Sequence, residues 1–127
     1  MPTRYEIDEA LQTAFSCCWG VLTIEESLAA MRTRRVDPRF RPHFRTLVDC
    51  TRVTTMDRGF DRGMSLVEAY RSGWSGPRTA RIALYVPQRN AVYGVLRQLE
   101  AMAGADGRLR LFTDMAEARA WIGLPPA

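Results

Sequence analysis

The sequence predicts an α/β domain in which a mixed, mostly parallel five-stranded sheet is covered by about four helices. Five short β-prone runs are separated by segments whose apolar residues recur at helical spacing. Only the short DEA segment separates the first two runs, as in an antiparallel hairpin, whereas helix-length segments separate the later ones. A chain of 127 residues fits one domain, so we expect residues 1–127 to form a single unit.

The expected order of elements is ββαβαβαβα. In chain order these are strands at 3–8 and 11–19, a helix at 24–35, a strand at 46–50, a helix at 57–71, a strand at 79–86, a helix at 89–103, a strand at 109–112 and a helix at 114–122. Each strand–helix–strand crossover should be right-handed, which makes the later strands parallel and packs the helices on the sheet.

The first helix has recognisable start and stop signals. Thr23 and Glu26 form a capping box, because the hydroxyl can accept from the backbone N–H near Glu26 and the glutamate can reach back. Leu28 and Met31 then lie on one face of the helix. Pro38 ends it, since the residue before a proline avoids helical geometry. The preceding β-prone run is expected to end near Gly20.

The middle of the chain predicts a buried strand followed by a weaker helix. Residues 46–50 contain a short continuous apolar run, which is typical of a central strand covered on both faces. The helix at 57–71 has an apolar stripe, although Gly59 and Gly63 each weaken it by about 1 kcal/mol relative to Ala if they are interior.

The last elements are marked by a proline and a second capping box. Pro87 ends the β-prone run at 79–86, and apolar residues at helical spacing follow in 89–103. Thr113 or Asp114 is expected to cap the final helix, and Asp114 and Glu117 have capping-box spacing.

Cysteine usage and the N-terminus predict a reducing, cytoplasmic setting. The chain has three cysteines, and its first residues are too acidic for a secretory signal. Cys17 and Cys18 are adjacent in a β-prone run, so their side chains should point to opposite faces. With no CxxC and one His, we expect no metal site and no cofactor. The cysteines are interpreted as small buried hydrophobes.

The positive charge is concentrated in one segment. All 18 basic residues are arginines, and residues 32–62 hold nine of them against four acidic residues. The candidate basic patch consists of Arg32, Arg34, Arg35, Arg39, Arg41 and Arg45. Arginines interleaved with Phe40 and Phe44 can hold nucleic acid, an anionic membrane surface or an acidic protein. The alternative is a solvated helix end and loop whose phenylalanines cover the edge of the core.

The stretch FRTLVDCTRVTTMDRGFDRG, residues 44–63, contains the candidate binding loop. This loop consists of Asp49, Thr51, Arg52, Thr54, Thr55, Asp57, Arg58 and Phe60. Asp49 and Asp57 could act as paired carboxylates. Acid–base chemistry would need one carboxyl group with a raised pKa and a partner within reach of a substrate. The simpler interpretation is that Asp57 caps the next helix and Asp49 accepts from nearby backbone. We therefore assign no catalytic residue.

The element order and the segment LVDCTRVTTMDRG resemble the STAS domain of anti-sigma-factor antagonists. In that family a buried strand ends in an Asp-containing segment, followed by a short loop and a helix start of the form Asp-Ser-Ser/Thr-Gly. Asp49, Val53 and Asp57 match this pattern, and the closing FTDMAEARAWIG is similar to the end of small STAS-like bacterial proteins. The resemblance implies a STAS-like fold and a binding or regulatory role.

The chain departs from the family at the switch position. Regulatory members have a phosphorylated Ser and a Gly after the loop Asp, whereas this chain has Arg58, Gly59 and Phe60. No hydroxyl stands at that position, so we expect no control by phosphorylation at this loop.

We therefore expect a non-enzymatic binding or regulatory module that acts on a protein partner or a small apolar ligand. The resemblance implies a ligand between sheet and helices, and the candidate lining is Met56, Phe60, Met64 and Trp74; ordinary core is the alternative. Self-association would use the N-terminal strands or a helix face. The alternative function is a basic module for nucleic acid or an anionic surface through Arg32–Arg45. A small enzyme using Asp49, Asp57 or Cys50 is the least favoured.

Overall fold

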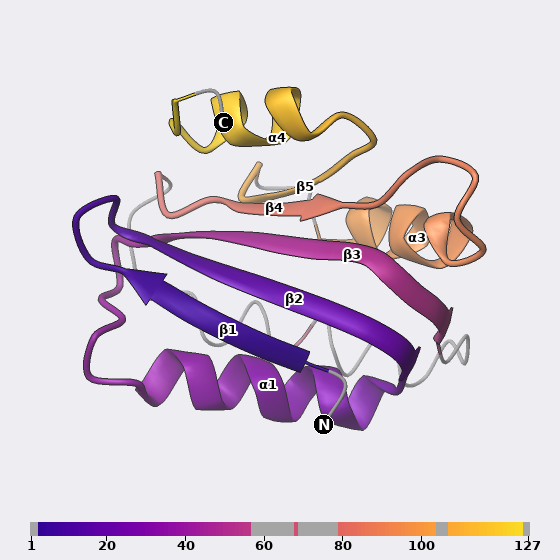
Figure 1. The fold of residues 1–127 in the computed structure, drawn as a ribbon, viewed down its shortest axis with the longest axis horizontal. Helices are drawn as coiled ribbons and strands as arrows, with labels where there is room; N and C mark the ends of the chain where they lie inside the picture. The colour runs from indigo at the N-terminus through magenta and orange to yellow at the C-terminus, as the bar shows by residue number, and fades with distance from the viewer. Residues whose placement is uncertain (1–2, 57–67, 69–78, 104–106, 126–127) are drawn as a thin grey trace.

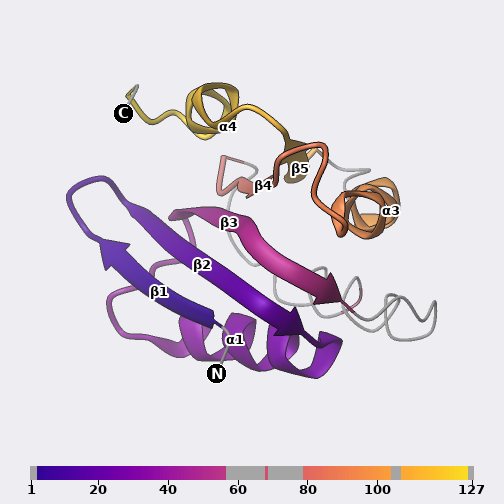
Figure 2. The same ribbon diagram turned by 45° about the vertical axis from the view of Figure 1, so that its right-hand side comes forward.

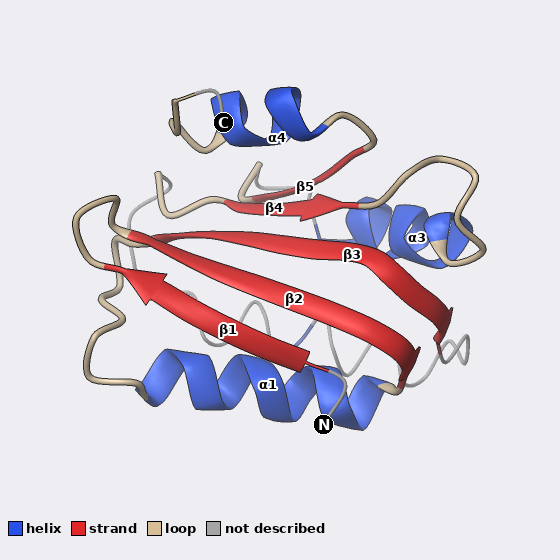
Figure 3. Cartoon of the chain, in the orientation of Figure 1, coloured by secondary structure: helices blue, strands red, loops and turns tan. Residues whose placement is uncertain are grey.

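A five-stranded mixed sheet forms the centre of the computed structural model (Figures 1 and 3). The structure describes residues 3–56, 68, 79–103 and 107–125. The strands are β1 (Thr3–Asp8), β2 (Thr13–Leu22), β3 (Arg45–Met56), β4 (Ile82–Tyr85) and β5 (Leu109–Phe112), and the helices are α1 (Ile24–Val36), α3 (Tyr93–Ala103) and α4 (Met115–Trp121). The strands lie in chain order across the sheet, with β1 antiparallel to β2 and every later pair parallel.

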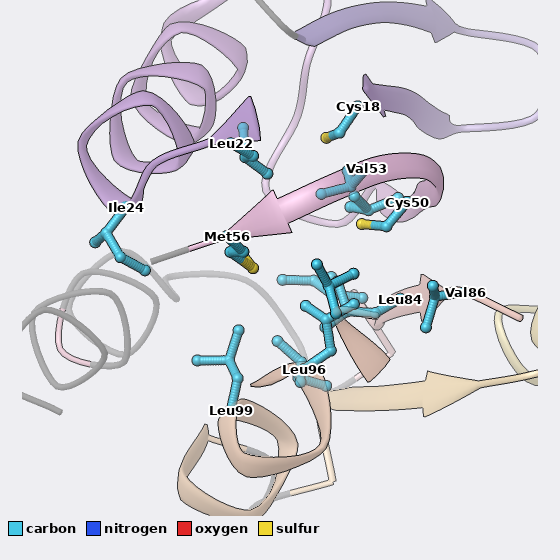
Figure 4. Packing of buried hydrophobic residues seen from close by; sticks show 14 of the residues in the cluster. Cys18, Leu22, Ile24, Cys50, Val53, Met56, Leu84, Val86, Leu96 and Leu99 are labelled. Atoms are coloured by element: carbon cyan, nitrogen blue, oxygen red, sulfur yellow. The ribbon is translucent and has the colours of Figure 1, made fainter. Parts of the chain in front are cut away.

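Alternating side chains divide the core between the two faces of the sheet, because successive residues of a strand point to opposite sides. On one face, strand residues such as Val48 and Leu84 pack with Met31 of α1 and Leu96 of α3 in the larger cluster. Figure 4 shows Leu84 and Leu96 among these side chains. On the other face, Leu47 packs in a smaller cluster with residues of α4. Helices α1 and α3 thus cover one face, and α4 covers part of the other.

Helix α4 leaves half of its face of the sheet open. It packs mainly on β4 and β5, and Figure 2 shows it lying away from β1 and β2. The side chains of β2 that point to this face beyond the covered half, Phe15, Cys17 and Trp19, are therefore partly exposed. This open half is where a ligand or partner has access to the sheet.

The capping signals are confirmed. Thr23 Oγ1 accepts from the backbone N–H of Glu26 at 3.1 Å and donates to its carboxylate at 3.0 Å. Asp114 accepts from the backbone N–H of Glu117 at 3.2 Å at the start of α4. Helix α1 ends at Asp37, whose backbone is extended, as expected before a proline.

The expected end of the middle strand, at residue 50, is wrong. Strand β3 continues to Met56, and its pairing with β2 shifts register twice, between Cys17 and Trp19 and again after Gly20. Beyond Cys50, the buried residues of β3 recur every third position instead of every second. A spacing of three is typical of neither a strand nor a helix, so the sequence pattern indicated a loop. Such bulges add unpaired residues to a strand.

Other boundaries also differ from the expectation. Strand β2 runs past Gly20 to Leu22, β4 is shorter than 79–86, and α3 begins at Tyr93, after a turn in which Asn90 donates to Pro87 O. The expected helix at 57–71 lies outside the described residues, so three of about four helices are described.

None of the described helices has the length and apolar character needed to cross a membrane.

The register shift beside Gly20 can be tested with two glycine substitutions. Gly20 has a φ of +67°, and neither Gly20 nor Gly94 of α3 has a neighbouring atom within 4 Å of the place that a Cβ would occupy. Gly20→Ala should lower the free energy of unfolding by about 1 kcal/mol, because L-residues disfavour left-handed backbone. Gly94→Ala should raise it by up to about 1 kcal/mol, because alanine favours helix. Urea unfolding followed by circular dichroism measures both, and an unchanged Gly20→Ala variant would contradict the shift.

Candidate functional site

The register of the sheet aligns one side chain from each strand into rows that cross the open face. Residues that pair side by side in adjacent strands point to the same face. The first row is Arg4, Cys17, Asp49, Tyr85 and Phe112. The second row is Glu6, Phe15, Leu47, Ala83 and Arg110. Helix α4 packs with Ala83 and Phe112 of these rows and leaves the β1 and β2 members accessible.

An open groove of about 340 Å³ lies over the accessible half of these rows, beside α4. We call it the sheet groove and define it by Arg4, Glu6, Phe15, Cys17, Leu47, Asp49, Met115 and Arg119. Phe15 and Leu47 of the sheet and Met115 of α4 supply its apolar surface. The four charged residues come from β1, β3 and α4, so the groove joins three elements that are far apart in the chain.

The charges of the sheet groove are balanced in number but differ in how they are engaged. Asp49 Oδ1 accepts from the backbone N–H of Thr51 at 2.9 Å and from its hydroxyl at 2.6 Å. Arg119 Nε donates to the carbonyl of Pro125 at 2.9 Å, which ties the segment after α4 to the helix. Arg4 is exposed and forms no ion pair within the described part of the chain. The carboxylate of Asp49 is thus better satisfied than the guanidinium of Arg4.

The chemistry available in the sheet groove is that of binding. An apolar surface and two arginines can hold a molecule that has an apolar body and an anionic group. Across the residues that the structure describes, no three His, Cys, Asp or Glu side chains are grouped so that they could hold a metal ion. The partner expected for Asp49 in acid–base chemistry, Asp57, lies outside those residues.

The candidate binding loop is largely strand. Thr51, Arg52, Thr54 and Thr55 lie on β3 and are exposed, so the loop assignment for these residues is wrong. Asp57, Arg58 and Phe60 lie outside the described residues. The physical reason is the pair of register shifts, which keeps β3 paired with β2 beyond Cys50.

Beyond the end of β4, the side-chain amide of Asn90 forms hydrogen bonds with the backbone of β3. Strand β4 pairs with β3 only as far as Asp49. Beyond this point, Asn90 Nδ2 donates to the carbonyls of Thr51 at 3.0 Å and Val53 at 3.1 Å, and its Oδ1 accepts from the N–H of Val92 at 2.9 Å. Asn90 therefore holds the turn before α3 against β3.

The six arginines of the candidate basic patch do not share one surface. Arg34 is 5% exposed and lies in the core, so its assignment to a surface patch is wrong. Arg39 binds the Asp37 carboxylate through Nε at 3.2 Å and Nη2 at 3.0 Å, and Arg45 donates to the carbonyl of Leu11. Arg32 and Arg41 are exposed, and Arg35 is partly buried.

Asp37 collects several of these contacts where α1 ends. Hydrogen bonds from the side chain and backbone of Arg39, and then from the hydroxyl of Tyr5 at 2.8 Å, hold the pKa of Asp37 well below its usual range. The same bond to Asp37, together with burial, raises the pKa of Tyr5. Phe44 is buried and stacks edge-on with Phe40, as expected of phenylalanines that cover the core edge. The segment is thus tied into the fold.

Most of the sheet groove was not identified from the sequence. Only Asp49 was singled out among its residues. The alternation of TRYEID places Arg4 and Glu6 on one side of their strand, which was a usable signal. Their meeting with Asp49 and Arg119 depends on strand order and on the position of α4, which no local pattern contains.

Comparison with known proteins adds no assignment to this site. The sequence matches no protein-family model, and no curated protein matches it in sequence. The resemblance to the STAS domain therefore stays a prediction, and the function proposed below depends on the geometry of this chain.

The bridging role of Asn90 leads to a stability prediction. Asn90→Ala removes three hydrogen bonds, so the free energy of unfolding should fall by about 2–3 kcal/mol at roughly 1 kcal/mol per bond. Gln88→Ala, at an exposed position of the same turn, is the control and should change it by less than about 0.5 kcal/mol. Urea unfolding measures both variants. Equal stability of the two would show that Asn90 does not hold β3.

Proposed function

We propose that the chain is a non-enzymatic, STAS-like binding module that holds a small amphipathic molecule in the sheet groove. The observation that carries the proposal is the groove itself: about 340 Å³ of open space over the uncovered half of the sheet, with apolar surface and a charged rim. Ligand pockets in proteins have volumes of about 300–1,000 Å³ and combine apolar walls with a few polar groups. The sheet groove is at the lower end of this range, which corresponds to a metabolite-sized ligand.

Arg4 gives the charged rim a place for the anionic group of a ligand. Asp49 already accepts two hydrogen bonds from Thr51, whereas Arg4 is exposed and without an ion pair in the described structure. A carboxylate, sulfonate or phosphate can bind a guanidinium through two parallel hydrogen bonds. The ligand's apolar body would contact Phe15, Leu47 and Met115.

The space between the sheet and the helices is a less suitable ligand site than the sheet groove. The cavity there has a volume of about 40 Å³, too small for an apolar metabolite. Met56, one of the residues expected to line such a site, is buried in the core cluster. The other three residues expected there, Phe60, Met64 and Trp74, lie outside the described residues.

A second candidate function is the binding of a protein partner by the same open face. Val21, on the part of β2 that extends beyond the covered half of the sheet, is 62% exposed, and Trp19 on the same strand is partly exposed. Exposed apolar side chains on an uncovered sheet are typical of interaction surfaces. Nucleic-acid binding through Arg32–Arg45 gains no support from the geometry, because Arg34, Arg39 and Arg45 are engaged within the fold.

The proposal is tested with 1-anilinonaphthalene-8-sulfonate, a fluorescent probe that combines an apolar body with an anion. The wild-type protein should bind it, and Arg4→Gln should weaken binding about tenfold, the loss of one charge-assisted hydrogen bond. Arg110→Gln is the matched control, because Arg110 is an exposed arginine of the second row that lies outside the groove. Fluorescence titration on folded protein, checked by circular dichroism, gives the affinities.

The possible outcomes separate the two candidate functions. Weaker binding by Arg4→Gln with unchanged binding by Arg110→Gln supports the sheet groove. Loss of binding in Val21→Ser, with Arg4→Gln unaffected, would place the probe on the exposed apolar surface and favour the protein partner. Equal binding by all variants, or none by the wild type, would refute the groove as the ligand site.

A further inference from the structure

An interior cavity on the other face of the sheet brings together two thiols and a buried cation. It has a volume of about 40 Å³ and lies between the sheet and helices α1 and α3. Its polar lining includes Ser16, Cys18, Ser27, Arg34 and Cys50. Ser16 also lines the sheet groove, whereas Cys18, Arg34 and Cys50 line only the interior cavity.

Within the part of the chain that the structure describes, no carboxylate forms an ion pair with the cation of this cavity. Arg34 is 5% exposed, and among the described residues no hydrogen bond or ion pair engages its guanidinium. Burial of an unpaired charge is costly, and proteins normally pair such a charge or neutralise it. The arrangement is therefore suited to the formation of an anion inside the cavity.

The two thiols line the same cavity from adjacent strands. Cys18 and Cys50 are 5% and 3% exposed and lie on the adjacent parallel strands β2 and β3, at the first register shift. The interaction between their side chains shifts the two thiol pKa values in opposite directions. Figure 4 shows both sulfur atoms in the core cluster.

The surroundings distinguish the two thiols. The hydrogen bond from Cys50, followed by the bond to Ser16 and the charge of Arg34, lowers the pKa of Cys18 against the opposing effects of burial and of Asp49. The hydrogen bond to Cys18 and burial raise the pKa of Cys50. The surroundings of Cys18 thus favour the thiolate, whereas those of Cys50 favour the protonated thiol.

We propose that Cys18 and Cys50 form a redox-active dithiol that reduces hydrogen peroxide, with Cys18 as the attacking thiol, Cys50 as the resolving thiol and Arg34 as the cation that stabilises the thiolate. The size of the cavity selects the substrate. A water molecule needs roughly 10–15 Å³ of such volume, so about 40 Å³ admits a molecule of a few atoms and excludes bulky hydroperoxides.

The reaction has two balanced steps. The Cys18 thiolate attacks one peroxide oxygen, the O–O bond breaks, and the departing hydroxide takes the thiol proton of Cys50 to leave as water. The Cys50 thiolate then attacks the sulfenic sulfur of Cys18, the S–O bond breaks, and the second hydroxide takes a proton from solvent. One peroxide is reduced to two waters, and the two thiols are oxidised to one disulfide.

The first test identifies the cross-link by mass spectrometry. After treatment with hydrogen peroxide and alkylation of the remaining thiols, trypsin should release the peptide that contains Cys18 joined to the peptide that contains Cys50. Cys17→Ser is the matched control, because Cys17 points to the opposite face, and it should retain the cross-link. Cys50→Ser should instead accumulate a sulfenic acid on Cys18 that dimedone traps. A cross-link that disappears in Cys17→Ser would overturn the proposal.

The second test separates a reactive thiol from one that is only buried. In Cys17→Ser/Cys50→Ser, hydrogen peroxide should consume the Cys18 thiol faster in native protein than in urea-unfolded protein, because the fold stabilises the thiolate; the remaining thiol is counted after an unfolding quench. A thiol that is merely buried would be slower when native, and that result would refute the proposal.

The role of Arg34 as a positioning residue is tested by its effect on the pH profile. Arg34→Met, which keeps the length of the side chain, should slow the oxidation of Cys18 by hydrogen peroxide about tenfold at neutral pH and move the pH profile of this rate to higher pH, as expected for about one pKa unit. Arg32→Met, at an exposed position of the same helix, should leave both unchanged. If Arg34→Met does not fold, the native-versus-unfolded comparison above decides the proposal without it. Identical profiles for the two folded variants would remove Arg34 from the mechanism.

Discussion

The parallel pairing of β2 with β3 is the constraint on which the rest of the structure depends. These two strands are the longest of the sheet, and the residues on either side of each backbone belong to different sites. One face of the pair supplies Phe15 and Leu47 to the sheet groove, and the other supplies Cys18 and Cys50 to the interior cavity. Since side chains alternate across a strand, a slip of one residue would exchange the two sets. Register is therefore the variable that decides both sites.

The unequal distribution of helices makes the two sites chemically different. Helices α1 and α3 cover one face of the sheet, so the cysteine pair is buried and lies in the same cavity as Arg34. The single short helix α4 covers only the β4–β5 half of the other face. On the uncovered half of that face, apolar side chains lie beside solvated charges, as is typical of a ligand groove. The thiol pair and the sheet groove thus lie on the same two strands, but the thiols are buried and the groove is open to solvent.

Arginine has several structural roles in this chain. Arg39 closes the end of α1 by binding Asp37, Arg45 holds the β1–β2 connection, and Arg34 is buried beside the cysteines. Local charge density along the sequence therefore does not describe the surface. A long side chain can place its guanidinium in the core or at a rim, and only the surrounding fold selects between them.

The sequence by itself determined the α/β class, the antiparallel start of the sheet, the parallel remainder and both capping boxes. These features follow from contacts within a few residues, such as Thr23 with Glu26, or from a periodicity that side-chain burial imposes on each element. Tertiary structure alone decided that β3 continues to Met56, because its pairing with β2 absorbs two register shifts. It also decided that Arg34 is buried and that Arg4 and Arg119 meet at one groove. Each of these depends on partners distant in the chain, whose positions no local pattern encodes.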